Sequence, residues 1–299
     1  MPQRDYLRAK SLFETATRAN LTDKHRSGAL VQLPAEGDLL VLGDLHGNRE
    51  NYSRVVEAAR LNGNPKRHLV IQEIAHVLEV GVDTSFDLIE EAAGLKIRFP
   101  DQVHFLMGNH EYAELVGEEI MKGGVCLNII FKEAIKRKYG EHYEEARQDL
   151  SRFLQTWPLA IRTETRLFFS HSTPETESIQ HFTLDFFRNR NENFYEDGDL
   201  IYSLLWSRDY AQEGADEFAR RMDADVLVVG HTACKNGFSM PSKRHVIIDS
   251  KDRNGCFLHV KLDRPYTAAE VARAVKRIFP ERERQAMAET QEAEAEVGE

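Results

Sequence analysis

Four short apolar runs along the chain each end at polar residues. They span residues 38–42, 103–107, 166–169 and 225–229. Brief runs rich in Leu, Val and Phe that stop at a glycine or a polar residue are typical of buried strands. Ligands of α/β sheets bind beyond the carboxyl ends of such strands. The pattern therefore predicts an α/β fold in which the polar residues after these strands gather at one edge of a sheet.

Between these runs, apolar residues recur at the spacing of one helix face. Asn48 is a suitable N-cap for one helix, and Gly94 is a suitable stop for the next. The expected helices run from the N-terminus to about Ala19, from Asn48 to the turn at 62–65, from Thr84 or Ser85 to Gly94, through 112–154 with breaks at 123–124 and 140, and from Ala268 to Ile278. We predict a connector at 27–37 and a loop-rich segment at 172–199.

The composition narrows the class of protein. The 299 residues allow one large α/β domain or two small ones. A net charge of −10 argues against a general nucleic-acid binder, because such binding depends on basic patches. The three cysteines are scattered and indicate neither a disulfide framework nor a zinc knuckle. Without an apolar signal segment or a membrane-spanning run, we expect a soluble cytoplasmic protein that binds no membrane.

The polar residues after the four strands are of the types that bind metals. Asp44 and His46 flank a single residue, so in an extended segment their side chains point to the same side. A carboxylate and an imidazole that converge in this way suit a divalent metal. Further along the chain, Asn109, His171 and His231 also follow predicted strands. Four such placements in one chain indicate a shared site.

These segments resemble the signatures of a known family. Four of its five motifs are present: Gly43-Asp44-Leu45-His46-Gly47, Gly108-Asn109-His110-Glu111, the lone His171 and Gly230-His231. They are similar to those of the calcineurin-like metallophosphoesterase superfamily, in its phosphoprotein (Ser/Thr) phosphatase branch, over about residues 36–262. The resemblance implies an α/β (α+β) fold, a calcineurin-like four-layer β-sandwich flanked by helices. It also implies three parts: an N-terminal helix and connector (1–35), a metallophosphoesterase domain (36–265), and a C-terminal helix with an acidic tail expected to be disordered (266–299).

The resemblance implies a centre of two divalent metal ions. Asp44 and His46 would hold the first metal, Asn109, His171 and His231 the second, and Glu73 would bridge them. Such a pair clamps phosphoryl oxygens and activates a hydroxide between the metals. Mixed carboxylate, amide and imidazole ligands suit Mn²⁺, which we expect, or Fe or Zn²⁺, better than Ca²⁺.

The second motif of the family departs from its pattern. Where the family has Gly-Asp-x-x-Asp-Arg-Gly, the chain has Gln72-Glu73-Ile74-Ala75-His76-Val77-Leu78. Glu73 therefore stands in place of the bridging Asp, and Glu can bridge two hard cations as Asp does. The alternative is that this motif has decayed into ordinary core. Val77 replaces an arginine that binds phosphate in the family, so phosphate affinity should be reduced.

Three residues are predicted to take part in catalysis. By resemblance, His110 is the general acid that protonates the leaving oxygen. Arg208, in an element similar to the family's Leu-Trp-x-Arg, would bind the substrate phosphate through its planar guanidinium, or else form a surface ion pair with Asp209. His76 occupies the position of the Asp that orients the acid. Its imidazole could contact His110 or the phosphate itself.

Three functions remain open from the sequence. The first is a phosphoric monoester hydrolase that acts on a phosphorylated protein or a small phosphoester. The second, which the same branch includes, is a hydrolase of dinucleoside polyphosphates or other nucleotides. The third is a non-catalytic binding protein that retains the fold but has a decayed site.

Overall fold

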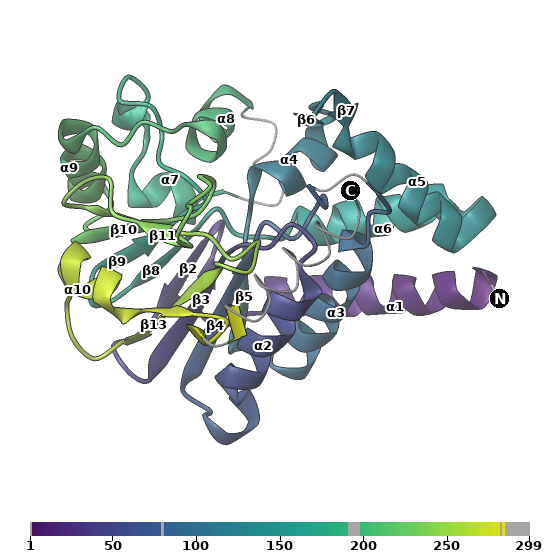
Figure 1. Ribbon diagram of the computed structural model, residues 1–299, viewed down its shortest axis with the longest axis horizontal. Helices are drawn as coiled ribbons and strands as arrows, with labels where there is room; N and C mark the ends of the chain where they lie inside the picture. The colour runs from purple at the N-terminus through teal and green to yellow at the C-terminus, as the bar shows by residue number, and fades with distance from the viewer. Residues whose placement is uncertain (1, 79–80, 191–197, 282, 285–299) are drawn as a thin grey trace, which may run out of the picture.

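Two stacked β-sheets form the centre of the molecule, in a computed structural model that describes residues 2–78, 81–190, 198–281 and 283–284 (Figure 1). The larger sheet has the order β1 (Arg26–Ser27), β2 (Leu30–Leu33), β8 (Ala160–Thr163), β9 (Leu167–Phe169), β10 (Val226–Val229), β12 (His245–Ile248), β11 (Phe238–Ser239). The smaller has the order β14 (Val275–Arg277), β13 (Cys256–Lys261), β3 (Asp38–Asp44), β4 (Arg67–Gln72), β5 (Val103–Leu106). A separate hairpin pairs β6 (Met121–Lys122) with β7 (Val125–Cys126).

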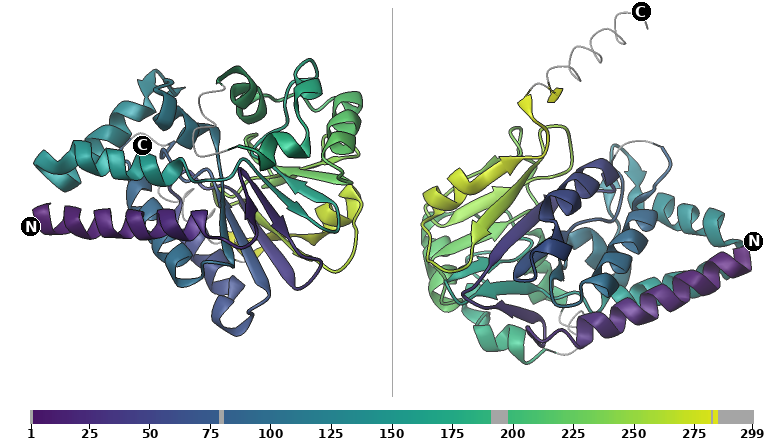
Figure 2. Two further views of the ribbon diagram at one scale, coloured as in Figure 1. Left: turned by 180° about the vertical axis from the view of Figure 1, so that it is seen from behind. Right: turned by 90° about the horizontal axis from the view of Figure 1, so that it is seen from below.

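Helices surround the two sheets (Figure 1). They are α1 (Pro2–Leu21), α2 (Arg49–Ala59), α3 (Ser85–Arg98), α4 (Asn109–Val116), α5 (Leu127–Tyr139), α6 (Tyr143–Leu154), α7 (Leu184–Arg188), α8 (Gly198–Trp206), α9 (Gln212–Arg221) and α10 (Ala268–Ala274). Helices α7, α8 and α9 lie on the side of the larger sheet, and α2 and α3 on that of the smaller (Figure 1). Helix α1 packs against α3 and α6 and projects beyond the sheets (Figure 2). No described helix is long and apolar enough to cross a membrane.

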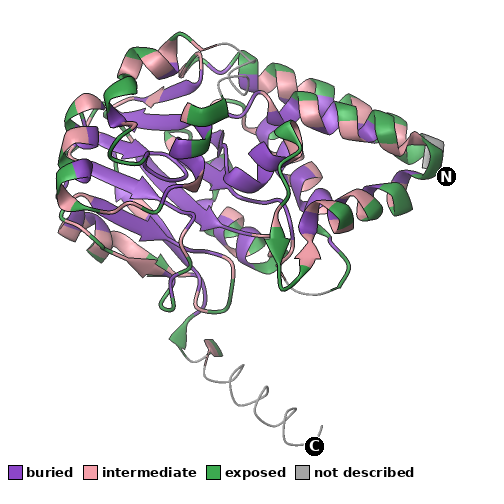
Figure 3. Cartoon of the chain, turned by 90° about the horizontal axis from the view of Figure 1, so that it is seen from above, coloured by how far each residue is buried: buried purple, intermediate pink, exposed green. Residues whose placement is uncertain are grey.

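The central strands are apolar on both faces because both faces are covered. In β3, Leu39 and Val41 belong to the core between the two sheets, whereas Leu40 and Leu42 pack toward the helices. This alternation is the two-residue period of a strand, and a parallel sheet covered on both faces uses near-continuous apolar runs. The strands are accordingly buried, while the helices are buried along one face only (Figure 3). The layered α/β fold expected from the sequence is confirmed.

Three local predictions are wrong. Helix α3 does not stop at Gly94 but continues to Arg98, just before Phe99-Pro100, where the proline disfavours helical backbone in the preceding residue. The last helix ends at Ala274 rather than at Ile278, because Val275–Arg277 pairs with β13 as β14. The expected connector at 27–37 contains β2, which pairs in parallel with β8. Asn48 does cap α2, accepting a hydrogen bond from the backbone N–H of Asn51.

The division into parts at residues 35 and 265 stays a prediction. Strand β2 precedes the first boundary and β14 follows the second, yet both pair with strands of residues 36–265. The residues expected to form an acidic tail lie, from 285 onward, outside the described residues.

A buried polar cluster lies at the amino ends of β4 and β5, at the opposite end of these strands from the candidate site. His68 Nδ1 is 3.0 Å from His104 Nε2, and His104 Nδ1 is 2.9 Å from an Asp23 carboxylate oxygen. Lys96 donates to the same Asp23 oxygen over 2.8 Å. Burial, followed by the neighbouring His104, lowers the pKa of His68 to about 3.

This cluster predicts that the fold loses stability in acid. His68 stays neutral in the folded chain but gains a proton in the unfolded chain near its ordinary pKa of about 6.5. The contribution of His68 to the free energy of unfolding is therefore complete above about pH 6.5. It is lost as the pH falls toward 3, at up to about 1.4 kcal/mol per pH unit. Urea unfolding at several pH values in EDTA should show a shallower pH slope for His68→Gln than for wild type. The exposed His181→Gln variant should keep the wild-type slope, and equal slopes for all three proteins would contradict the assignment.

Candidate functional site

The carboxyl ends of five parallel-paired strands bring the predicted site residues together. Strands β3, β4 and β5 pair in parallel in one sheet, and β9 and β10 in the other. Their ends open into a pocket of about 550 Å³. The lining of this pocket includes seven of the predicted site residues: Asp44, His46, Glu73, Asn109, His110, Arg208 and His231. His171 lies directly behind them, against Asn109.

The backbone at this edge is bent in an unusual way. Among the described non-glycine residues with positive φ are His46 at 45°, Glu73 at 46°, His76 at 64° and His231 at 64°. A non-glycine residue in this region costs of order 1–3 kcal/mol and persists only where the surroundings hold it. Here the backbone N–H groups of Leu45 and His46 both donate to the carbonyl of Glu73, over 2.9 and 2.8 Å. These bonds tie the loop after β3 to the loop after β4.

Three acceptor atoms face one another at the second predicted metal position. Asn109 Oδ1 is 2.8 Å from His171 Nε2 and 2.9 Å from His231 Nδ1. The opposite ring nitrogens are 3.0–3.1 Å from acceptors: His231 Nε2 from the carbonyl of Trp206, and His171 Nδ1 from Gln72 Oε1. Each of these nitrogens therefore carries the hydrogen, which leaves a lone pair on the nitrogen that faces Asn109.

The charge states of these histidines strengthen this conclusion. Burial, followed by Arg208, lowers the pKa of His231 to about 4. Burial, followed by His231, lowers the pKa of His171 well below its ordinary value. Both imidazoles are therefore neutral near pH 7, which is the form that binds metals. With these tautomers, three lone pairs converge without a hydrogen between them, and a cation placed among them would remove their mutual repulsion. The residues present thus fit a metal ion.

The residues predicted for the first metal lie next to this group. His46 Nδ1 is 3.3 Å from the carbonyl of Ala75, which leaves Nε2 as the ligand atom. Burial lowers the pKa of His46 to about 3. Burial and the neighbouring Asp249 raise the pKa of Asp44, whose Oδ1 accepts from the backbone N–H of His231 over 3.0 Å. The positive charge of Lys251 opposes this rise in pKa without cancelling it, and a bound cation would favour the ionised carboxylate further.

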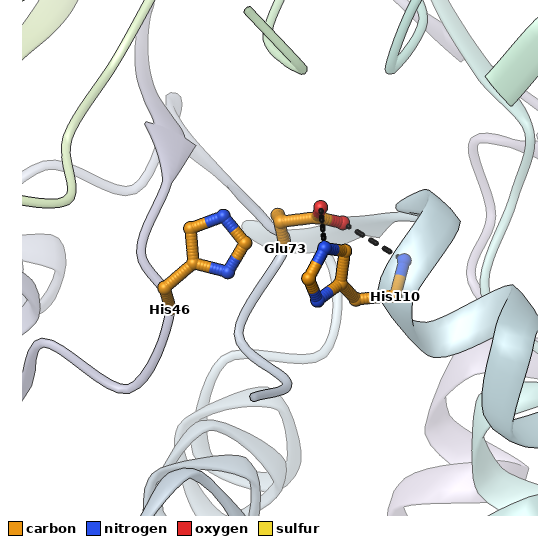
Figure 4. A group of neighbouring side chains, drawn as sticks. All are labelled: His46, Glu73 and His110. Atoms are coloured by element: carbon orange, nitrogen blue, oxygen red, sulfur yellow. Dashed lines mark hydrogen bonds and ion pairs between the residues drawn. The ribbon is translucent and has the colours of Figure 1, made fainter. Parts of the chain in front are cut away.

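Glu73 lies between the two groups. One of its carboxylate oxygens is 3.6 Å from His171 Nε2 and 3.7 Å from His110 Nε2. Potential ligand atoms of His46, Glu73 and His110 all lie within 4.8 Å of one another (Figure 4). Burial, Glu111 and Asp44, in that order, raise the pKa of Glu73. This position is compatible with the bridging role predicted for Glu73.

Gly108 makes room for the Glu73 carboxylate. A Cβ atom at Gly108 would lie 1.8 Å from Glu73 Oε2 and 2.5 Å from Glu111 Oε2. Glu111 cannot easily yield, because its other oxygen accepts from the backbone N–H groups of Ile74 and Ala75, both over 2.7 Å. The glycine is therefore needed for the space it leaves, since its φ of −95° is open to any residue.

Gly108→Ala is expected to lower metal content and hydrolytic activity. The added methyl group pushes the Glu73 carboxylate away from the other ligands, and disturbed support of a metal ligand typically costs ~10–100-fold in affinity or activity. Elemental analysis after gel filtration and an aryl phosphate assay measure both quantities. Gly63→Ala is the matched control, because no atom lies within 4 Å of a Cβ built there. Full metal content in Gly108→Ala would show that the space is not required.

His110 and His76 are in direct contact. Their Nδ1 atoms are 3.0 Å apart, and His76 is completely buried. His76 is not one of the described residues that line the pocket. The structure thus places it against His110, the first of the two contacts considered from the sequence. Burial, followed by His46 and His76, lowers the pKa of His110.

Arg208 extends along the pocket wall, and its guanidinium is 3.5 Å from the carbonyl of His231. The surface ion pair with Asp209 is not the arrangement found. Asp209 instead accepts from the Thr176 hydroxyl over 2.6 Å and from the backbone N–H of Ala211 over 3.0 Å. The guanidinium is therefore available to an anion in the pocket.

Two residues near this site were missed from the sequence. Lys251 lines the pocket and pairs with Asp249. It follows β12 at the same sheet edge as the other site residues, which is the signal that could have identified it. Glu114 contacts His76 over 2.9 Å. It stands four residues after His110 on α4, so the two are neighbours on one helix face.

The chain is similar in sequence to known proteins. The family described as Calcineurin-like phosphoesterase matches residues 38–235. A probable serine/threonine-protein phosphatase of Encephalitozoon cuniculi is 25% identical over 228 residues, which are 74% of this chain. The match spans only 45% of that relative's own length.

Solved structures show the same fold. A protein serine/threonine phosphatase from Saccharomyces cerevisiae, with similarity to human phosphatase PP5, superposes with a TM-score of 0.66 at 17% identity, over 86% of this chain and 82% of that one. A cold-active protein-tyrosine phosphatase of a psychrophilic Shewanella species superposes with a TM-score of 0.57 at 17% identity, over 78% and 77% of the two chains.

Proposed function

Because this chain belongs to the calcineurin-like phosphoesterase family, we propose that it is a metal-dependent phosphoester hydrolase with a dinuclear metal centre. The observation that carries the proposal is the convergence of Asn109, His171 and His231 through atoms that bear lone pairs, beside a second group of buried carboxylates and imidazole. Family membership supports a reaction at phosphorus. The donor set supports the use of metals.

The six ligands already described would be divided between two metal positions. Asp44 and His46 would hold one ion, Asn109, His171 and His231 the other, and Glu73 would contact both. When bound, such a pair supplies charge neutralisation for the phosphoryl oxygens and an acidified water. We propose Mn²⁺, with Fe or Zn²⁺ as the other candidates, because the ligands combine oxygen with imidazole nitrogen.

The chain's own residues supply substrate binding and the proton. Arg208 would bind the phosphate bidentately, because its planar guanidinium matches two phosphate oxygens. Lys251 adds a second positive charge to the pocket. Val77, which stands at the position of the family's phosphate-binding arginine, supplies none. His110 would donate a proton to the leaving oxygen, which otherwise departs as an unstable alkoxide.

The proposed substrates are phosphorylated proteins of the serine/threonine type or small phosphoesters. The relative from Encephalitozoon cuniculi supports this class, since it is named a probable serine/threonine-protein phosphatase. The pocket lining also includes the apolar residues Leu78, Ile120, Met121 and Leu127. Such side chains can contact the carbon part of a phosphorylated side chain or an aryl group.

The test is metal-dependent hydrolysis by the purified chain expressed with Mn²⁺. We expect two metal ions per chain by elemental analysis, release of 4-nitrophenol from 4-nitrophenyl phosphate, and loss of this activity in EDTA with recovery on adding Mn²⁺. A panel of phosphopeptides, small phosphoesters and dinucleoside polyphosphates then identifies the substrate class. Preferential cleavage of the polyphosphates would replace the proposed class by the nucleotide hydrolase. Absence of metal and of hydrolysis would favour the binding protein.

A further inference from the structure

A line of three side chains leads from the pocket into the protein. His110 lies at the pocket, its Nδ1 is 3.0 Å from His76 Nδ1, and His76 Nε2 is 2.9 Å from Glu114 Oε1. The His76 side chain is 0% exposed and that of Glu114 is 9% exposed. The carboxylate at the end of the line is thus almost shielded from water, where its hydrogen bonds are strong.

The Glu114 carboxylate determines which ring nitrogens of His76 and His110 carry a hydrogen. An ionised carboxylate can only accept, so His76 Nε2 must carry a hydrogen. A neutral His76 then has a lone pair on Nδ1 and can only accept there. His110 Nδ1 must therefore be the donor to His76. One carboxylate, placed two contacts away, selects the tautomer of both rings.

Glu114 is itself held in place. The Asn128 side-chain amide donates to the same Oε1 over 2.7 Å. Glu114 and His110 lie one turn apart on α4, so their relative position is set by the helix. The His76 ring packs edge-to-face against the Phe131 ring of α5, with 5.3 Å between the ring centroids and an interplanar angle of 77°. The line is thus supported by two helices, α4, which begins at the proposed ligand Asn109, and α5.

We propose that Glu114 is a positioning residue for the proton donor, acting through His76. The inference rests on the proposed function, in which His110 protonates the leaving group. Glu114 compensates for the carboxylate that is absent at position 76: a histidine relays its effect to His110. With Nδ1–H of His110 directed at His76, Nε2 is the ring nitrogen presented to the pocket, where a leaving oxygen would lie. The neutral ring has no hydrogen on Nε2. His110 therefore takes a second proton from solvent at Nε2 before it donates that proton to the leaving oxygen, and it returns to the neutral form on donating it. Outer partners of this kind orient the residues that act directly on the substrate.

The test compares two leaving groups in the metal-loaded full chain. 4-Nitrophenolate leaves readily without a proton, whereas phenolate gains much more from one. Glu114→Leu removes the acceptor while keeping a side chain of similar length. We expect its kcat for phenyl phosphate to fall ~10–100-fold and its kcat for 4-nitrophenyl phosphate to change far less. Glu114→Gln keeps an acceptor oxygen for His76 and should retain most of the phenyl phosphate activity.

Matched measurements separate this role from a structural one. Glu118→Leu, in the exposed segment after α4, should behave as wild type with both substrates. Metal content and thermal unfolding are compared for each variant. Equal losses with the two substrates in Glu114→Leu, no loss at all, or a Gln variant as damaged as the Leu variant would overturn the inference. If the wild-type chain hydrolyses neither substrate, it is the proposed function that fails.

Discussion

Replacing His110 by asparagine is expected to slow hydrolysis by ~10²–10⁴-fold, the usual contribution of a positioned acid, while the metal content stays at the wild-type level. The reason is a division of roles within Gly108-Asn109-His110-Glu111. Asn109 faces His171 and His231 through its Oδ1, whereas His110 turns its ring toward His76 and Glu73. Loss of the imidazole removes the proton donor and leaves the ligands of the proposed centre in place.

The measurement pairs steady-state kinetics on phenyl phosphate with elemental analysis of the same preparation. Metal content is informative because His46, Glu73 and His110 also have ligand atoms close enough to share one ion. A His110→Asn variant that loses metal would therefore identify His110 as a ligand and contradict its role as the acid. His181→Asn, at an exposed site outside the pocket, is the matched histidine control and should retain full activity.

Glu73→Gln is expected to abolish most metal binding at the proposed two-ion centre, and with it the activity. Glu73 is 1% exposed, and its carboxylate lies between the two groups of ligands. Two cations held close together repel each other, and the negative charge of a bridging carboxylate offsets that repulsion. The amide is nearly the same size but carries no charge. Metal stoichiometry and kcat should therefore fall together.

Glu73→Asp is the matched variant for this experiment. It keeps the negative charge and restores the aspartate of the family's second motif, whose side chain is one methylene shorter than that of Glu73. We expect it to retain metal and part of the activity. If Glu73→Gln instead matches wild type in both assays, Glu73 is not the bridge. The second motif would then have decayed, and the binding-protein hypothesis would gain support.

Much of the site could be predicted because its residues follow strands. A strand's period and its closing turn are local properties, and parallel strands deliver their carboxyl ends to one edge. This is why Asp44, Asn109 and His231 were expected together before any fold was known. The same logic applied to His171, although it lies behind the pocket wall rather than on it. Their roles as ligands stay predictions until metal is measured.

The sequence by itself determined the layered α/β fold, the helix start at Asn48 and the family, because apolar periodicity, capping and short motifs are encoded by neighbouring residues. Only the tertiary structure decided that residues 275–277 form a strand, since that depends on the free edge of β13. It also decided that Glu114 contacts His76, 38 positions away, and that Lys251 reaches the pocket. Such contacts arise from how separate segments pack, and local propensity contains no information about which segments will meet.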